Sequence, residues 1–567
     1  MLSGKRFVIW GLCRLSVRVA QAMAAGRAQV TVIRLNGESD ALLPLLGAGV
    51  RTLDAPAGAT SEALRAAGLA EATALLALSE SDLSNLQATV TARETAPNIP
   101  VILRAFDPLL ADQLEQGWNV RRAYSVSALA APAFIAAACG DTVLETLRMG
   151  DGEVPLCRLT VRDGSPLIGL VAAEVKARLG CAVLARLAPQ TEWHAVAGEA
   201  ALEPLALGEQ VLIGGPRDSV LRAVTRNRGW RKTRRGFWRR PPKSPAPRRP
   251  TPTRLLPTAA VLTAALFASV FVFRHTLHLS PVDALYFVVT TATTTGYGDI
   301  SLKDTPDWVK LCGCAVMLTG GALLGIVFSY LAALATAERL DETLSRRAGS
   351  LTDHIIVAGL GNLGYRVARQ LADLGLDVSV LDLAPRPRFA ESLRDRVPVL
   401  TGDASLPDNL ERVGVASAAA FLACTNDDLS NIQACLYAKR LNPKITTVAR
   451  IFDDTLAEQL PHAFAIDRAL SASGAAVSAF VGAATDELAL RLLPLGGLTF
   501  LVGRHQTTEP LTIELLDLWR AAGVRQLAFR LKDGTLQAAS ELALPHPAGT
   551  ELILCGPAEA VRGIIGG

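Results

Sequence analysis

The chain has 567 residues, enough for three or four domains, and 50% of them are hydrophobic, with a mean hydropathy of +0.30. This apolar content is high for a protein made of soluble domains alone. The net charge of +4 is uneven, because residues 226–254 carry 12 Lys and Arg and no acid. The remaining residues therefore have a net charge of −8, which excludes a uniformly basic chain.

The N-terminus predicts a folded α/β domain. Arg6–Gly11 reads as a strand that enters a tight turn, and Gln29–Ile33 reads as the next strand after an amphipathic helix. Lys5 starts that first strand, so we interpret this stretch as structure and expect no cleavable signal peptide.

A basic, proline-rich segment at residues 226–254 separates this first part from an apolar stretch. It contains Arg231–Arg240 and lies just before the first candidate membrane span. The positive-inside rule places it in the cytoplasm, where it would also face anionic lipid heads. A nucleic-acid patch is the competing interpretation, which the adjoining span disfavours.

Two apolar segments are long enough to cross a bilayer. Leu255–Phe273 carries no charge, and Val309–Ala335 is interrupted only by Lys310 near its start. Between them, Ser280–Thr291 predicts a short helix with Ser280 as N-cap, and it is too short to span. We expect a re-entrant helix whose C-terminal end points its partial negative charge toward a cation path.

The run Thr291-Ala-Thr-Thr-Thr-Gly-Tyr-Gly-Asp299 follows this short helix. It fits the T-x-x-T-x-G-Y-G-D pattern and resembles the filter loop of the potassium channel family, except that Thr295 stands where Val or Ile is usual. In such a filter, four loops present rings of carbonyl oxygens that replace the water shell of the ion. The resemblance assigns the filter to Thr294, Thr295, Gly296, Tyr297, Gly298 and Asp299. The alternative is a threonine-rich turn without function.

Gly320-Gly321 lies inside the second span. Similar channels bend at such a position to open, so these glycines are a candidate gating hinge. Close packing of helices through small residues explains them equally well.

A second α/β segment begins at His354–Gly359. Gly359-Leu-Gly361-Asn-Leu-Gly364 is a complete G-x-G-x-x-G after a predicted strand, and Asp382 ends the next strand. The glycines allow a pyrophosphate to approach the helix N-terminus, and Asp382 would hold a ribose hydroxyl. A packed turn without ligand is the alternative.

The two soluble parts, which we name arm one (residues 1–225) and arm two (residues 351–567), repeat each other. Leu76–Asn85 matches Leu422–Asn431, and Ile102–Asp107 matches Val448–Asp453. Strands that alternate with helices at this spacing indicate a doubly wound parallel sheet in each arm. The expected order is therefore sheet domain, membrane segment, sheet domain.

Arm one is a degenerate copy. Its turn reads Gly11-Leu-Cys13-Arg-Leu-Ser16, so two glycines are missing, and Arg34 replaces the ribose-binding acid. We expect it to bind no dinucleotide. Arg14 and Arg34 would hold an anion or, as we favour, form salt bridges at the surface or between subunits.

Both arms resemble RCK domains, the regulatory modules related to the Trk N-terminal domain, and the resemblance covers almost the whole chain. It implies domains at 1–150 (degenerate Rossmann lobe), 151–225 (small α+β C-terminal lobe), 226–254 (linker), 255–340 (two-span pore), 351–485 (Rossmann lobe) and 496–567 (small lobe). The nucleotide site that it implies in arm two consists of Gly359, Gly361, Asn362, Leu363, Gly364, Asp382, Asp403, Ala404, Thr425, Asn426, Asp427 and Arg450.

The resemblance implies a ligand-gated, potassium-selective channel that is a homotetramer in the cell inner membrane with both termini in the cytoplasm. Expected ligands are K⁺ in the filter and an adenine nucleotide (NAD, NADH, ATP or ADP) in arm two, and a divalent cation is a further candidate. Asp427, Asp428, Asp453 and Asp454 are candidate cation ligands, although helix caps and turns explain them better. Membrane lipid is a further expected partner, and nucleic acid is not.

The alternatives are a non-selective cation channel, a regulatory subunit of a potassium uptake system and a nicotinamide oxidoreductase. We expect no enzyme, because the seven histidines are scattered and no catalytic grouping is evident. The nine cysteines form no C-x-x-C pair, and we interpret them as reduced.

Overall fold

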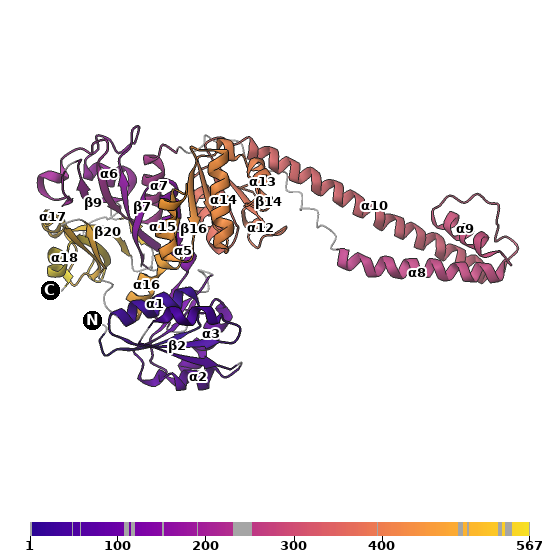
Figure 1. The fold of residues 1–567 in the computed structure, drawn as a ribbon, viewed down its shortest axis with the longest axis horizontal. Helices are drawn as coiled ribbons and strands as arrows, with labels where there is room; N and C mark the ends of the chain where they lie inside the picture. The colour runs from indigo at the N-terminus through magenta and orange to yellow at the C-terminus, as the bar shows by residue number, and fades with distance from the viewer. Residues whose placement is uncertain are drawn as a thin grey trace. The chain divides into compact units, whose positions relative to one another are not determined.

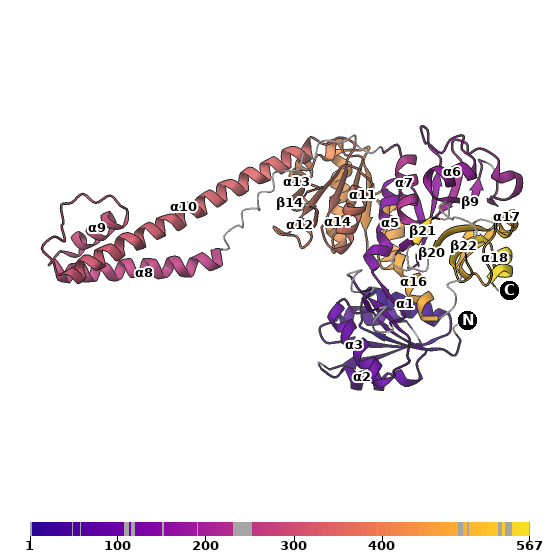
Figure 2. The ribbon, with the colours of Figure 1, turned by 180° about the vertical axis from the view of Figure 1, so that it is seen from behind.

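The computed structural model (Figures 1 and 2) consists of two compact units: residues 236–346, and residues 1–235 together with 347–567. The structure describes all residues except 1–2, 48, 57, 107–110, 112, 115–119, 150–151, 190, 231–251, 394, 486–490, 496–497, 531–535, 539–546 and 566–567.

The N-terminal lobe of arm one is a parallel sheet with the strand order β3-β2-β1-β4-β5-β6. Short apolar strands buried on both faces explain why helices cover the sheet. Its elements are β1 (Arg6–Trp10), α1 (Arg14–Ala25), β2 (Gln29–Leu35), η1 (Asp40–Leu46), β3 (Val50–Ala55), α2 (Thr60–Ala66), η2 (Leu69–Glu71), β4 (Ala74–Ala77), α3 (Asp82–Thr95), β5 (Val101–Arg104) and β6 (Arg122–Tyr124).

Arm two repeats this topology with the order β14-β13-β12-β15-β16-β17, which confirms the predicted doubly wound sheets. Its elements are β12 (Ile355–Ala358), α11 (Asn362–Asp373), β13 (Val378–Asp382), α12 (Ala390–Leu393), β14 (Val399–Thr401), α13 (Pro407–Arg412), η4 (Val415–Ser417), β15 (Ala420–Ala423), α14 (Asp428–Leu441), β16 (Thr446–Arg450), α15 (Asp454–Ala463) and β17 (Arg468–Leu470).

The helix that follows each sheet packs against the other arm. Helix α5 (Val126–Ala138) of arm one lies on α11, and helix α16 (Gly474–Thr485) of arm two lies on α1 (Figure 2). Phe134 therefore belongs to a core with arm-two residues, while Phe480 belongs to the core of arm one and meets Tyr124 edge-on at 5.2 Å between ring centroids. The two arms share their cores, and the sequence analysis did not predict this exchange.

The C-terminal lobes are antiparallel sheets with the orders β10-β9-β11-β8-β7 and β18-β19-β22-β20-β21, and they share an apolar cluster that includes Leu156, Leu184 and Phe500. The turn predicted at Arg162–Gly164 is present, and the one predicted at 532–534 lies outside the described residues. The elements are β7 (Thr142–Met149), β8 (Gly152–Thr160), α6 (Ala172–Leu179), β9 (Ala182–Leu187), β10 (His194–Ala195), η3 (Gly198–Ala201), β11 (Gln210–Gly214), α7 (Arg217–Asn227), β18 (Arg491–Leu495), β19 (Leu498–Gln506), α17 (Ile513–Ala521), β20 (Arg525–Arg530), β21 (Leu536–Ala538), β22 (Glu551–Pro557) and α18 (Ala558–Ile565).

The other unit contains the expected membrane segment. Helix α8 (Pro252–Thr276) and helix α10 (Asp307–Gly349) each include a stretch that is long and apolar enough to cross a membrane, Pro257–Thr276 and Asp307–Leu331. Helix α9 (Pro281–Ala292) lies between them in sequence and is too short to span, as predicted. It packs on α8 through Phe287, whose ring meets Phe273 edge-on at 5.0 Å.

Candidate functional sites

The loop after α9 has an unusual backbone. Thr294, Gly296 and Gly298 have φ angles of +61°, +51° and +81°, and the residues between them do not have positive φ. The sign of φ therefore alternates from residue to residue along the predicted filter, which alternates the backbone between left-handed and right-handed conformations. Peptide groups in such an alternating run turn the same way, whereas those of an ordinary strand alternate in direction. This arrangement suits a row of carbonyl oxygens that faces one side.

Local hydrogen bonds hold the start of this loop on the end of α9. The N–H groups of Thr295 and Gly296 both donate to the Thr290 carbonyl, at 2.9 and 3.1 Å, and the hydroxyls of Thr293 and Thr295 lie 3.0 Å apart. The threonine-rich sequence thus satisfies backbone groups that the end of a helix leaves open. The ring of Tyr297 lies parallel to that of Tyr286, with 6.5 Å between centroids, and is 72% exposed in the single chain.

Ser280 is the N-cap of α9, as predicted, and accepts a hydrogen bond from the Asp283 N–H at 3.2 Å. Pro281 occupies the first turn, where its missing N–H costs nothing. The C-terminal end of α9, with its partial negative charge, leads directly into the alternating loop.

The two glycines of the predicted hinge differ in their surroundings. A Cβ on Gly320 would lie 2.3 Å from the Ala292 carbonyl oxygen, so α10 approaches the end of α9 closely there. A Cβ on Gly321 would meet nothing within 4 Å. Close packing therefore explains Gly320, and the role of Gly321 as a hinge stays a prediction.

In arm two, the glycine turn meets the geometric demands of a nucleotide site. Gly359 has a φ of +90°, and a Cβ on it would lie 2.9 Å from the Thr425 nitrogen. A Cβ on Gly364 would lie 1.9 Å from the Gly359 carbonyl oxygen, so only glycine permits this approach of helix to strand. Gly361 is the N-cap of α11 and has no side-chain cap, which leaves the helix N-terminus open, with Asn362 and Leu363 in its first turn.

Asp382 lies beside this turn at the end of β13, where the sequence predicted it. Its two carboxylate oxygens accept hydrogen bonds from the N–H groups of Leu360 at 2.5 Å and Ala384 at 2.8 Å. The carboxylate is thus held beside the glycine turn, and its role in binding a ribose hydroxyl stays a prediction.

The remaining predicted residues of arm two are engaged in local structure. Asp403, which precedes Ala404, accepts from the N–H and hydroxyl of Ser405 at 2.8 and 2.7 Å, so its carboxylate caps a turn. Arg450 donates to Asn426 Oδ1 at 2.7 Å and lies 4.6 Å from the centroid of the Phe452 ring. Burial lowers the pKa of Arg450.

Asn431 connects the loops after β15 and β16, and it was not among the site residues predicted from the sequence. Its side chain is fully buried, accepts from the Thr425 N–H and hydroxyl at 3.0 and 2.7 Å, and donates to the carbonyls of Thr425 and Arg450 at 3.1 and 2.8 Å. It therefore ties the end of β15 to the end of β16. The same residue type occurs at the equivalent position of arm one, Asn85, and this repetition was the sequence feature that could have identified Asn431.

Two of the four acidic candidates for a divalent cation are helix caps. Asp427 caps α14 and Asp453 caps α15, each through the N–H three residues on, at 2.7 and 2.8 Å, so the interpretation as caps is confirmed for these two. The hydrogen bonds with Ser430 lower the pKa of Asp427, while burial raises that of Asp428. No group of three or more metal-binding side chains occurs among the described residues.

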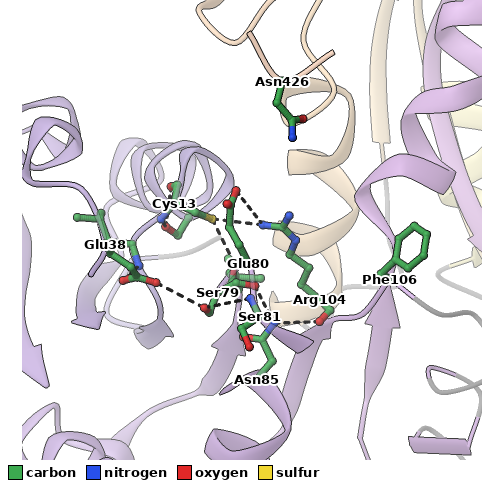
Figure 3. Close-up of polar contacts among 12 residues, drawn as sticks. Cys13, Glu38, Ser79, Glu80, Ser81, Asn85, Arg104, Phe106 and Asn426 are labelled. Atoms are coloured by element: carbon green, nitrogen blue, oxygen red, sulfur yellow. Dashed lines mark hydrogen bonds and ion pairs between the residues drawn. The ribbon is translucent and has the colours of Figure 1, made fainter. Parts of the chain in front are cut away.

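Arm one has different side chains around the equivalent turn, among them Cys13 (Figure 3). The Ser16 hydroxyl accepts from the Cys13 N–H at 2.7 Å and donates to the Cys13 carbonyl at 2.8 Å. The Cys13 thiol donates to the Leu78 carbonyl at 3.2 Å. Arg34 pairs with Asp54 at 2.7 Å and with Asp40, so it forms in-chain ion pairs, whereas the Arg14 guanidinium lies 4.4 Å from the Phe452 ring centroid.

The two arms also exchange matched contacts beside their crevices. Arg18 of α1 donates to the Phe452 carbonyl of arm two at 2.5 Å, and Arg366 of α11 donates to the Phe106 carbonyl of arm one at 2.7 Å. The two arginines occupy equivalent positions in the repeat, as do the two phenylalanines. The arms therefore face each other with approximate two-fold symmetry in this part of the structure.

Comparisons with known proteins agree with this division. The TrkA-N domain family matches residues 7–125 and 355–472, and a family described as Ion channel matches residues 259–337. The Trk system potassium uptake protein TrkA homolog of Pyrococcus abyssi is 42% identical over 102 residues, 18% of this chain and 44% of that protein. The probable potassium channel protein 2 of Methanocaldococcus jannaschii is 28% identical over 178 residues, 30% of this chain and 50% of that protein.

The chain thus spans half or less of the length of these two relatives. A solved structure described as the GsuK channel bound to NAD has a TM-score of 0.48 at 16% identity, covering 99% of this chain and 78% of that chain.

Two TrkA-N domains flank an ion channel domain in this chain. The relatives of the chain include potassium channels, and its arrangement of domains is the one that the resemblance implied. With the channel-domain match, the two apolar helices make it a membrane protein. The TrkA-N matches support nucleotide binding, and the channels among its relatives are not enzymes, in agreement with the prediction from the sequence.

Proposed function

We propose that the chain is one subunit of a potassium-selective channel whose opening depends on an adenine nucleotide bound in arm two. The alternating backbone hand at Thr294–Gly298 is the observation that supports potassium selectivity most directly. Carbonyl oxygens that face one side replace the hydration shell of K⁺, and the Thr294 hydroxyl adds a further oxygen at the inner mouth.

The pore requires several subunits, because two spans cannot enclose one. Four copies related by a rotation axis would complete the filter and supply eight RCK domains. By the positive-inside rule, the basic segment before α8 supports a cytoplasmic location for both termini, with the spans in the cell inner membrane. Membrane lipid is the expected partner of that segment. We keep the domain bounds that were proposed in the sequence analysis.

The coupling of nucleotide to pore follows from chain connectivity. Helix α10 ends at Gly349, and β12, the first strand of arm two, begins at Ile355. A ligand opens the gate only if it binds one state better than the other, so the crevice of arm two must differ between the open and closed channel. Asp382 and the open N-terminus of α11 are the groups we assign to the nucleotide, and a divalent cation is a further candidate effector.

Potassium flux into liposomes that contain the full-length protein tests the proposal. We expect K⁺ uptake that Na⁺ does not match, and Tyr297→Ala should remove either the flux or its selectivity while the arms stay folded. A non-selective cation channel would pass both ions. A regulatory subunit of an uptake system would pass neither, although a channel region within the same chain argues against it.

A further inference from the structure

The replacement of the ribose-binding acid by Arg34 suggested that arm one has lost this part of a nucleotide site. The structure shows another carboxylate in the same place (Figure 3). Glu38, in the loop after β2, accepts a hydrogen bond from the Leu12 N–H at 2.6 Å. Its other carboxylate oxygen lies 3.5 Å from the Ser79 hydroxyl. Leu12 follows Gly11 as Leu360 follows Gly359, and the Leu360 N–H donates to Asp382 at 2.5 Å.

The second hydrogen bond of each carboxylate comes from a backbone N–H at or just after the end of the second strand, although not from the same position of the repeat. Glu38 accepts from the N–H of Leu35, the last residue of β2, at 2.8 Å, and Asp382 accepts from the N–H of Ala384, just after β13, at 2.8 Å. Each acid therefore joins the glycine turn to the C-terminal end of the second strand. Gly11 also keeps the close approach of its counterpart, because a Cβ on it would lie 2.6 Å from the Ser79 Cα.

The phosphate end of arm one is different. The Cys13 N–H, at the position of Gly361, is taken by the Ser16 hydroxyl at 2.7 Å, and Ser16 stands where arm two has Gly364. The Cys13 thiol reaches from the turn after β1 to the Leu78 carbonyl after β4, across the point where the strand order reverses. A dinucleotide crosses an open sheet at that point, with its pyrophosphate at the helix N-terminus.

We propose that arm one keeps a complete ribose-binding end built on Glu38, and that Cys13 and Ser16 alone close its phosphate end. These residues would then decide which arm takes the nucleotide. The inference rests on the proposed function of arm two and adds to it the residues that set the difference between the arms.

The test restores the phosphate end in the full-length channel. Binding of NAD and of ADP is titrated separately by calorimetry on wild type, on Asp382→Ala, and on Cys13→Gly/Ser16→Gly made in the Asp382→Ala background. We expect wild type to bind about one nucleotide per chain, Asp382→Ala to lose at least tenfold in affinity, and the combined variant to regain a site. Adding Glu38→Gln to the combined variant should weaken that regained site at least tenfold.

The outcomes separate this inference from the proposed function. If wild type binds neither nucleotide, the nucleotide role of arm two fails, and Cys13→Gly/Ser16→Gly alone still tests arm one. If the folded combined variant binds nothing, Cys13 and Ser16 do not close the site and the inference is wrong. If Glu38→Gln leaves the regained site intact, Glu38 is not its ribose acid. If thermal melting shows that the combined variant is unfolded, Ser16→Gly alone in the same background is titrated, and no gain in affinity would overturn the inference.

Discussion

Thr294 is a β-branched residue held at a φ of +61°, a region that L-residues with a branched Cβ rarely adopt. Such a conformation costs about 1–3 kcal/mol and persists where the surroundings impose it, which is typical of functional sites. The hydrogen bonds of the Thr295 and Gly296 N–H groups to the Thr290 carbonyl impose it here. The strain at Thr294 is therefore a consequence of the backbone alignment in the predicted filter.

Asp382→Ala should lower nucleotide affinity at least tenfold without changing single-channel conductance. Losing a hydrogen bond from a charged group to ribose costs about 1.5–3 kcal/mol, and the filter belongs to the other compact unit. Dose–response curves of open probability on patches measure the shift. Identical curves for variant and wild type would show that arm two is not the sensor.

Asn431→Ala should lower both nucleotide affinity and thermal stability, because it leaves buried partners at Thr425 and Arg450 unsatisfied, at about 1–3 kcal/mol. Asn85→Ala is the matched control. Asn85 donates to the Ser79 and Arg104 carbonyls at 2.8 and 3.0 Å in arm one, so its loss should lower stability alone. Equal loss of nucleotide affinity in both variants would contradict the assignment of the site to arm two.

At the scale of elements, the structure departs most from sequence expectation in helices α5 and α16. Both are apolar on nearly all sides, so their periodicity predicts burial but not the partner, and each packs on the other arm. The capped helix α9 and the strands of both sheets were predictable, because caps and short apolar runs are local signals. The place of Glu38 beside the glycine turn was not predictable, because Glu38 lies in a loop and no local sequence pattern determines the conformation of that loop.

Phe480→Ala should destabilise arm one, although the residue belongs to the sequence of arm two. Phe480 is fully buried in a cluster with Ile9 and Val32, and truncating such a side chain costs about 3–5 kcal/mol. Hydrogen exchange of the full-length protein should show lost protection in β1 and β2. Leu429→Ala, at a 61% exposed position of α14, is the control that should leave protection unchanged. Loss confined to arm two would contradict the exchange of helices.

The junction between α5 and β7 should make stability depend on pH. Burial raises the pKa of Asp141 to about 6, although Arg162 lies 3.0 Å away and opposes the shift. The pKa of Asp141 in the folded protein is above the ordinary value of 3.8. Its contribution to the free energy of unfolding is therefore fully present below pH 3.8 and is lost as pH rises through 6. A shift of this size corresponds to about 3 kcal/mol at most.

Melting temperatures of wild type and Asp141→Asn across pH 4–7 measure this effect. The wild type should lose stability relative to the variant as pH rises, because the asparagine does not titrate. A constant difference between the two proteins over this range would show that Asp141 keeps its ordinary pKa.

At the scale of the whole molecule, the predicted filter belongs to one compact unit and the predicted nucleotide site to the other, and the chain connects the two units through α10. Arm one contributes its swapped helix α5 to the core of arm two and the carbonyl of Phe106 to Arg366. The sequence predicted the order of the parts, because the repeat and the two spans are visible in it. It could not predict the shared cores, which arise from contacts between residues hundreds of positions apart.

The reversal potential of the reconstituted full-length protein, measured with K⁺ on one side of a bilayer and a K⁺/Na⁺ mixture on the other, tests potassium selectivity most directly. Alternating backbone hand from Thr294 to Gly298 predicts a reversal close to the K⁺ equilibrium potential. A reversal near the value expected for equal K⁺ and Na⁺ permeability would contradict the account and identify a non-selective cation channel.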